Sequence, residues 1–348
     1  RDVLLAKTAY WIRMTQTDHI REYKMENSKK IFIVTEAILA VIVLLVSITM
    51  LREKSREKWD KVSVIIQDSD DNAWAAFKYG LRMAAQDWEI DMVVVGTGEK
   101  LSEEEEMKAI QNQIDLGADA VIVQPVPGDG MQSSLEKLQN RIPIMLVESS
   151  AAKRGIECNI PVVLPDNYAM GRALGEELQK DYNGNLKGKK LGIVSQYADS
   201  NAVTERREGL KSSLDQSEIE ICWEVSDISA DEKDTILESQ AKADVIIALD
   251  DYSLTLVGKS ASANSLYGAL VYGIGNSTEA VYYLDAGFVQ CLVAPDEFNM
   301  GYQSLTEAAK RVKNMFREPQ SRIVSFTVIR RDTLFSEENQ KILFTMSQ

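Results

Sequence analysis

Short apolar runs alternate with amphipathic stretches along most of this chain, and this alternation restricts the possible folds more than any other feature. The runs are continuously apolar, as strands are when helices cover both faces of a parallel sheet. Ser102 with Glu105 has the pattern of a helix-starting capping box, and Asp166 precedes another helical stretch. The pattern predicts an α/β architecture. The predicted strands are Val62–Ile66, Met92–Val95, Ala120–Val123, Ile144–Val147, Leu191–Val194, Ile219–Val225, Val245–Leu249, Ala269–Ile274 and Val289–Val293.

Composition excludes several classes of function. The chain has 348 residues, enough for two domains, but one histidine, His19, so a histidine-pair metal site and a serine–histidine relay are excluded. Three scattered cysteines do not suit a zinc ribbon or a disulfide framework. A net charge of -14 would repel phosphate backbones, which argues against nucleic acid as a partner. We predict no metal and no cofactor.

An apolar run from Ile31 to Met50 contains one charged residue, Glu36, and is long enough to cross a bilayer. We predict a single transmembrane anchor over 31–51, although a buried core helix is the alternative. Basic residues dominate 1–30 and acidic residues dominate the chain after 59, which favours a cytoplasmic tail at 1–30 and a body outside the cytoplasm. The expected location is therefore the cell membrane, with one span.

Met25 starts a short basic segment that leads directly into the apolar run, as in an uncleaved signal anchor. Residues 1–24 are therefore expected not to belong to the natural product. The alternative is a genuine cytoplasmic extension with a partner of its own.

Polar residues follow several predicted strands, at the edge where open α/β sheets bind ligands. Asp71, Asn72 and Trp74 follow the first strand, Glu148 the fourth and Asp250 the seventh. Carboxylates accept hydrogen bonds from hydroxyl groups, and an indole covers the apolar face of a sugar ring. The alternative for each acid is that it caps the following helix.

Seven segments, in order and at proper spacing, resemble the periplasmic sugar-binding proteins of the ribose-binding type. They are KVSVIIQDSDDNAWAAFKYGLRMAAQ, QNQIDLGADAVIVQPV, IPIMLVESS, LPDNYAMGRALGEEL, TERREGL, VIIALDDYSLTLVG and DTLFSEENQKILF. This family shares its fold with the ligand-sensing part of lac-repressor-like regulators. The resemblance implies two doubly wound parallel-sheet domains joined by a three-strand hinge, the periplasmic-binding-protein-like I fold, here preceded by one N-terminal transmembrane helix.

The resemblance also implies ligand contacts and domain limits. Ligand contacts fall at Asp71, Trp74, Glu148, Arg206 and Asp250. The hinge falls near Asn159–Val163, Ala294–Asp296 and Arg322–Ser325. Lobe 1 takes 61–160 plus 296–324, and lobe 2 takes 161–295 plus 325–348.

Two positions depart from the sugar pattern of the family. Gly275 stands where an Asp is usual, and Pro295 stands where a polar Gln or Asn often contacts the ligand. Asn276, next to Gly275, is expected to substitute. Ribose itself is therefore not implied.

The resemblance implies a membrane-anchored, extracytoplasmic solute-binding protein that binds a sugar or similar polar molecule and presents it to an ATP-driven importer. The alternative partner is a sensor kinase that reads the closed form. A glycosidase that uses two cleft carboxylates, and a scaffold with a non-functional cleft, are less favoured, and we predict no enzymatic activity. A transcription factor is disfavoured because an apolar span stands where those regulators carry a helix-turn-helix.

Overall fold

The computed structural model describes residues 35–47, 59–67, 74–98, 101–128, 130–152, 156–228 and 235–343. Asp60–Gln348 forms one compact unit, distinct from Arg1–Trp59. Of the predicted anchor, only 35–47 is described, and it is helical with exposed side chains. Within the described ranges, no helix combines the length and the hydropathy that crossing a membrane requires. The remainder of 31–51 and the predicted tail lie outside the described residues.

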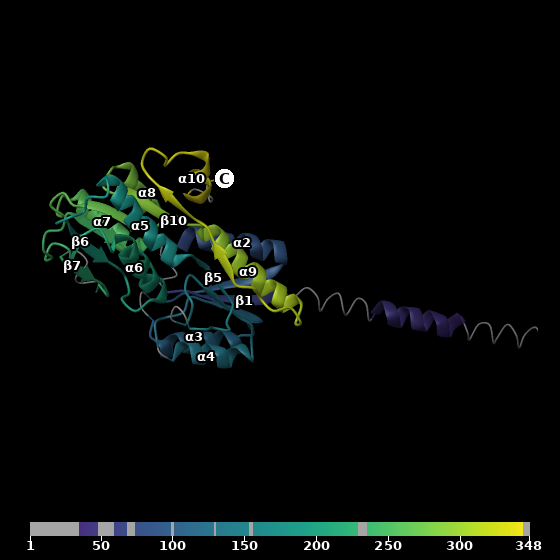
Figure 1. Cartoon of the computed structure of the whole chain (residues 1–348). Helices are drawn as coiled ribbons and strands as arrows, with labels where there is room; N and C mark the ends of the chain where they lie inside the picture. Colours follow the sequence, from purple (N-terminus) through teal and green to yellow (C-terminus); the bar gives the residue numbers. More distant parts are fainter. Residues whose placement is uncertain are drawn as a thin grey trace, which may run out of the picture. The chain divides into compact units, whose positions relative to one another are not determined.

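Six strands form the sheet of the first lobe: β1 (Asp60–Ile65), β2 (Ile90–Val95), β3 (Ala120–Val123), β4 (Ile144–Val147), β5 (Val162–Pro165) and β11 (Arg322–Val324). All pairs are parallel, in the order β11-β5-β4-β3-β1-β2. One face carries α2 (Ala75–Trp88) and α9 (Glu297–Lys313), and the other carries α3 (Glu103–Asp115) and α4 (Met131–Gln139) (Figure 1). This lobe therefore has an apolar core on each side of its sheet.

The second lobe repeats this plan with β6 (Lys190–Val194), β7 (Glu220–Val225), β8 (Val245–Ala248), β9 (Leu270–Ile274), β10 (Cys291–Pro295) and β12 (Phe326–Ile329). Its order is β12-β10-β9-β8-β6-β7, and β12 is antiparallel to β10. One face carries α5 (Asn167–Asp181) and α6 (Asn201–Leu214), and the other carries α7 (Asp251–Ser262) and α8 (Thr278–Asp285). A short helix, α10 (Glu337–Leu343), follows β12. The predicted fold class of two doubly wound parallel-sheet lobes is confirmed.

The chain crosses between the lobes three times. Strand β5 pairs with β4 and β11 in the first sheet, so the first crossing lies at Asp166 and not within the predicted Asn159–Val163. Lobe 1 therefore extends to Pro165, beyond the expected limit at residue 160. The other two crossings lie at Asp296, between β10 and α9, and at Ser325, between β11 and β12.

Side-chain caps fix where several helices begin. Ser102 and Glu105 form the predicted capping box at the start of α3, and the Asp166 carboxylate accepts a hydrogen bond from the Ala169 amide at 2.9 Å. These caps satisfy amide groups that the helix leaves unpaired. The Asp166 cap starts α5 directly after the first crossing and so determines where the second lobe begins.

Candidate functional site

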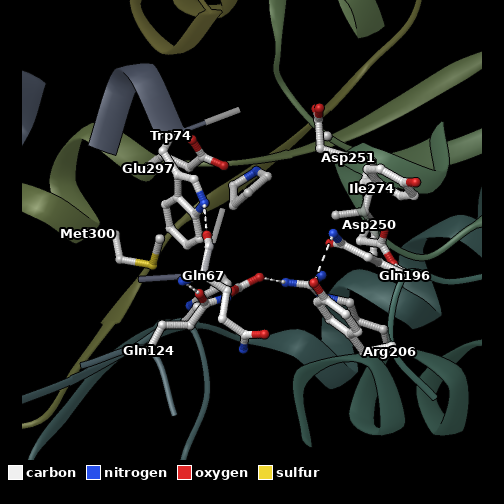
Figure 2. Close-up of a pocket in the computed structure, with 16 residues that line it drawn as sticks. Gln67, Trp74, Gln124, Gln196, Arg206, Asp250, Asp251, Ile274, Glu297 and Met300 are labelled. Carbon is white, nitrogen blue, oxygen red and sulfur yellow. Dashed lines mark hydrogen bonds and ion pairs between the residues drawn. The ribbon is translucent and has the colours of Figure 1, made fainter. Parts of the chain in front are cut away.

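A cavity lies between the two lobes. Its empty volume is about 720 Å³, including space open to solvent, a size common for small-molecule sites. Figure 2 shows Gln67, Trp74, Gln124, Glu297 and Met300 on one side, facing residues of the second lobe that include Gln196 and Arg206. The lining residues are Gln67, Trp74, Gln124, Glu148, Pro165, Gln196, Tyr197, Arg206, Asp250, Asp251, Tyr252, Ile274, Gly275, Pro295, Glu297 and Met300.

The structure brings four of the predicted site residues to this cavity: Trp74, Glu148, Arg206 and Asp250. Asn276 lies behind the lining, is only 8% exposed and donates a hydrogen bond to the Pro295 carbonyl at 3.3 Å. The other two, Asp71 and Asn72, lie outside the described residues. Trp74 is fixed by an Nε1 hydrogen bond to the Gln67 carbonyl at 3.1 Å.

An ion pair between Glu148 and Arg206 bridges the lobes. Arg206 Nη2 lies 3.3 Å from Glu148 Oε1. The other two guanidinium nitrogens of Arg206 donate hydrogen bonds within the second lobe, Nε to Asn167 Oδ1 at 2.8 Å and Nη1 to the Leu249 carbonyl at 3.0 Å. Glu148 has a φ of 64°, a left-handed backbone rare for this residue type, and its carbonyl accepts from Asn167 Nδ2 at 3.0 Å. Gln124 donates to its second carboxylate oxygen at 2.6 Å. Both charges are therefore held in fixed positions.

Two glycines position Arg206. A Cβ at Gly171 would overlap the Arg206 carbonyl oxygen, and a Cβ at Gly209 would overlap the Tyr168 carbonyl oxygen. Helices α5 and α6 therefore cross with their backbones in contact, which brings Arg206 beside Asn167. This crossing gives a structural reason for Gly171 in the segment LPDNYAMGRALGEEL and for Gly209 in the segment TERREGL.

Gly171→Ala is expected to lower the free energy of unfolding by about 1–3 kcal/mol, because the added methyl group must push the two helices apart. Urea unfolding monitored by tryptophan fluorescence measures this change. Gly96→Ala is the matched control, because a Cβ at Gly96 meets no atom within 4 Å. Equal stability of the two variants would contradict the close crossing.

Asp250 and Asp251 have different structural roles. Asp250 caps α7 by accepting from the Ser253 amide at 2.8 Å, and its other oxygen accepts from the Gln196 amide at 2.7 Å. Burial raises the pKa of Asp250, although these hydrogen bonds oppose the shift. Asp250 thus both caps a helix, the alternative considered for the loop acids, and lines the cavity.

Asp251 explains the glycine that departs from the sugar pattern. A Cβ at Gly275 would overlap Asp251 Oδ1, and the same oxygen accepts from the amides of Asn276 and Ser277, both at 2.9 Å. The Asp251 carboxylate therefore takes the space that a side chain at 275 would need. A residue of α7 thus supplies a carboxylate at the end of β9.

Glu297 is a lining residue that no sequence pattern singled out. Its Oε2 atom is buried and has no hydrogen-bond partner among the described residues. Burial, and then the neighbouring carboxylates of Asp251 and Glu148, raise the pKa of Glu297 well above its usual value; Asn276 and Arg206 act in the opposite direction. Gln67, Gln124, Gln196 and Asp251 were also not selected as ligand contacts, although each lies within three residues of a strand end.

A family model described as the periplasmic binding protein domain matches residues 62–314. GanP, a glucose-galactose binding protein from Geobacillus stearothermophilus, superposes with a TM-score of 0.69 at 18% identity, covering 80% of this chain and 100% of its own. The Caulobacter myo-inositol binding protein bound to myo-inositol gives a TM-score of 0.71 at 19% identity, covering 82% and 98%.

A chain of the XylFII-LytSN complex gives a TM-score of 0.67 at 17% identity, covering 79% of this chain and 99% of its own. At these identities the similarity to the solved structures establishes the fold. No curated protein sequence matches the chain.

Proposed function

We propose, from the premise that the chain belongs to the periplasmic binding protein domain family, that it binds a polar small molecule of the sugar class between its lobes. The observation that carries this proposal is a cavity lined from both lobes that combines apolar surface with several polar side chains and contains the Glu148–Arg206 ion pair between the lobes. Asn201 Nδ2 also donates to the Ser150 carbonyl across the lobes at 2.8 Å. Contacts of this kind would favour a closed arrangement of the lobes around a ligand.

A thermal-shift titration against pentoses, hexoses and inositols tests the proposal. A ligand present at 100 times its dissociation constant stabilises the folded state by about 2.7 kcal/mol, which raises the melting temperature. If no compound in the panel changes the melting temperature, the alternative of a scaffold with a non-functional cleft is favoured. Gly275 and Pro295, which replace two ligand-contacting residues of the family pattern, would then explain the lack of binding.

Trp74→Ala is expected to weaken binding of any such ligand by at least about tenfold, because the indole that lines the cavity would cover the apolar face of the ring. Trp59→Ala is the matched control, since that indole is 49% exposed and is not part of the cavity lining. Each variant loses one tryptophan, so their fluorescence signals remain comparable. An equal loss of affinity in the two variants would show that Trp74 does not contact the ligand.

For the rest of the protein we propose a membrane anchor at 31–51, a lobed body outside the cytoplasm, and presentation of the ligand to an ATP-driven importer. Anchoring brings binder and permease to a high effective concentration. The XylFII-LytSN complex supports a second candidate, in which the liganded body binds a signalling protein such as a sensor kinase. Loss of ligand uptake in a deletion strain favours the importer, and loss of a transcriptional response with intact uptake favours the sensor.

We assign no catalysis to the cavity, because the family is one of binding proteins. The competing assignment is a glycosidase that would use a pair of cleft carboxylates as acid and base. Incubation with aryl glycosides separates the two, and release of the aryl group that depends on Glu148 would support the enzyme.

A further inference from the structure

More carboxyl groups than cations line the cavity between the lobes. Among its described lining residues, the carboxylates of Glu148, Asp250, Asp251 and Glu297 stand against one guanidinium, that of Arg206. Arg206 contacts Glu148 at 3.3 Å and so neutralises one of them. Backbone amides compensate two others, because Asp250 accepts from Gln196 and Ser253 and Asp251 accepts from Asn276 and Ser277.

Among the carboxylates of the cavity, Glu297 is the one that the protein accommodates least. Its Oε2 atom is buried without a hydrogen-bond partner among the described residues, although the residue lines the cavity. Burying an ionised carboxylate is costly unless a cation or several donors compensate it. The ionised form of Glu297 therefore requires a positive group, or several hydrogen-bond donors, that enter the cavity with the ligand.

The surroundings favour an organic cation over a metal ion. In the part of the chain that the structure describes, no group of three or more acidic, cysteine or histidine side chains is arranged to hold a metal. Trp74, Tyr197 and Tyr252 line the same cavity, and aromatic faces attract ammonium groups. Carboxylates and aromatic rings together are the usual environment of a bound ammonium.

We infer that the ligand of this cavity carries an ammonium group, which binds to the Glu297 carboxylate beside Asp251 and Glu148. Amino sugars are the class that joins such a group to a polyhydroxylated ring. This inference rests on the proposed function and narrows it from sugars in general to those with a free amine.

The inference predicts a pH dependence with a definite sign. Glu297 faces Asp251 from α7, Glu148 after β4, Arg206 from α6 and Asn276 after β9, and burial raises its pKa well above the usual value. An ammonium group stabilises the ionised carboxylate and lowers its pKa, so binding releases a proton in the pH range between the lowered pKa of the bound state and the raised pKa of the free state. Affinity for an amine that stays protonated therefore rises with pH through this range, whereas the affinity for a neutral sugar does not depend on ionised Glu297 in this way.

Isothermal titration of the full chain tests this, in a polyoxyethylene detergent because common sugar detergents would compete. The probes are D-glucosamine and D-galactosamine, with D-glucose, D-galactose and the two N-acetylated amino sugars as neutral counterparts. We expect at least one amine to bind 100-fold more tightly than its neutral counterparts. Repeating the titration at pH 6 in two buffers with different ionisation enthalpies should reveal release of up to one proton per ligand.

E297Q removes the charge with little change in shape and is expected to weaken amine binding by at least tenfold and abolish the proton release. E279Q is the matched control, because Glu279 is an exposed acid in the first turn of α8, outside the cavity lining. The comparison of amines with neutral sugars on the unmodified chain remains decisive if E297Q fails to fold.

The outcomes separate this inference from the proposed function. Neutral sugars that bind at least as tightly as the amines would overturn the inference and leave the proposed function standing. Amine binding that E297Q leaves unchanged would overturn the assignment to Glu297. Failure of every sugar and amine to bind would overturn both.

Discussion

Arg206→Ala is expected to abolish ligand binding and to lower the free energy of unfolding by about 3–5 kcal/mol, the usual cost of removing one partner from a buried ion pair. The Arg206 side chain is 4% exposed and that of Glu148 is 22% exposed. The change would leave Glu148 without its cation and would remove donors from Asn167 and the Leu249 carbonyl. Urea unfolding and ligand titration of the same sample measure both effects.

Arg207→Ala is the matched control for that prediction. Arg207 is the next residue along α6 and pairs with Glu224 at 3.1 Å, where the side chains are 21% and 35% exposed. Ion pairs closer to solvent contribute about 1 kcal/mol or less, so a small loss of stability and unchanged ligand binding are expected. If both variants lost stability equally and both still bound ligand, Arg206 would be an ordinary surface cation.

The strands that the sequence predicts best are those buried on both faces. The bounds of β3 and β4 agree with the predicted runs, because a strand between two helical layers is apolar throughout. The search for apolar runs did not predict strands β11 and β12, because they are short edge strands with partly exposed side chains, such as Ile323 at 76% exposure; only the family resemblance placed a hinge segment at Arg322–Ser325, which contains β11. These two strands form by pairing with the edges of β5 and β10. No local pattern in residues 322–329 reveals this pairing.

The sequence could identify those site residues that follow an apolar run, because such runs predict strands and ligands bind at strand ends. Trp74, Glu148 and Asp250 were found by this rule, whereas Arg206, on a helix, was selected through the family resemblance. Glu297 lies in the first turn of α9, where an acid is expected simply because it favours the helix dipole. Only the fold shows that this turn faces the cavity.

Glu106 provides the second large expected effect, in the first lobe and outside the cavity lining. It lies on α3 with an exposed fraction of 0%, its Oε2 accepts from the Val126 amide at 3.2 Å, and its Oε1 has no partner among the described residues. Burial raises the pKa of Glu106 from 4.5 to about 8; the Val126 hydrogen bond opposes this shift and the nearby Glu103 adds to it. The native chain therefore keeps this carboxyl protonated at neutral pH.

Between pH 4.5 and about 8 the native state binds one more proton than the unfolded state, because only the native carboxyl of Glu106 stays protonated there. The free energy of unfolding therefore has its full contribution from protonated Glu106 below this range and loses it as pH rises through the range. Glu106→Gln mimics the protonated form. It should match the unmodified chain near pH 4.5 and exceed it by a few kcal/mol at pH 9, since one pKa unit corresponds to about 1.4 kcal/mol.

Urea unfolding of the two chains at pH 4.5, 6, 7.5 and 9 measures this difference, and the comparison cancels the titration of all groups that they share. Glu104→Gln on the same helix is the control, because Glu104 is exposed and pairs only with Lys108 at the surface, at 2.8 Å. Its removal should leave the free energy of unfolding nearly unchanged at every pH, because solvent screens this exposed ion pair. Parallel pH profiles for Glu106→Gln and the unmodified chain would show that Glu106 is ionised in the native state, so that its burial would require a compensating donor.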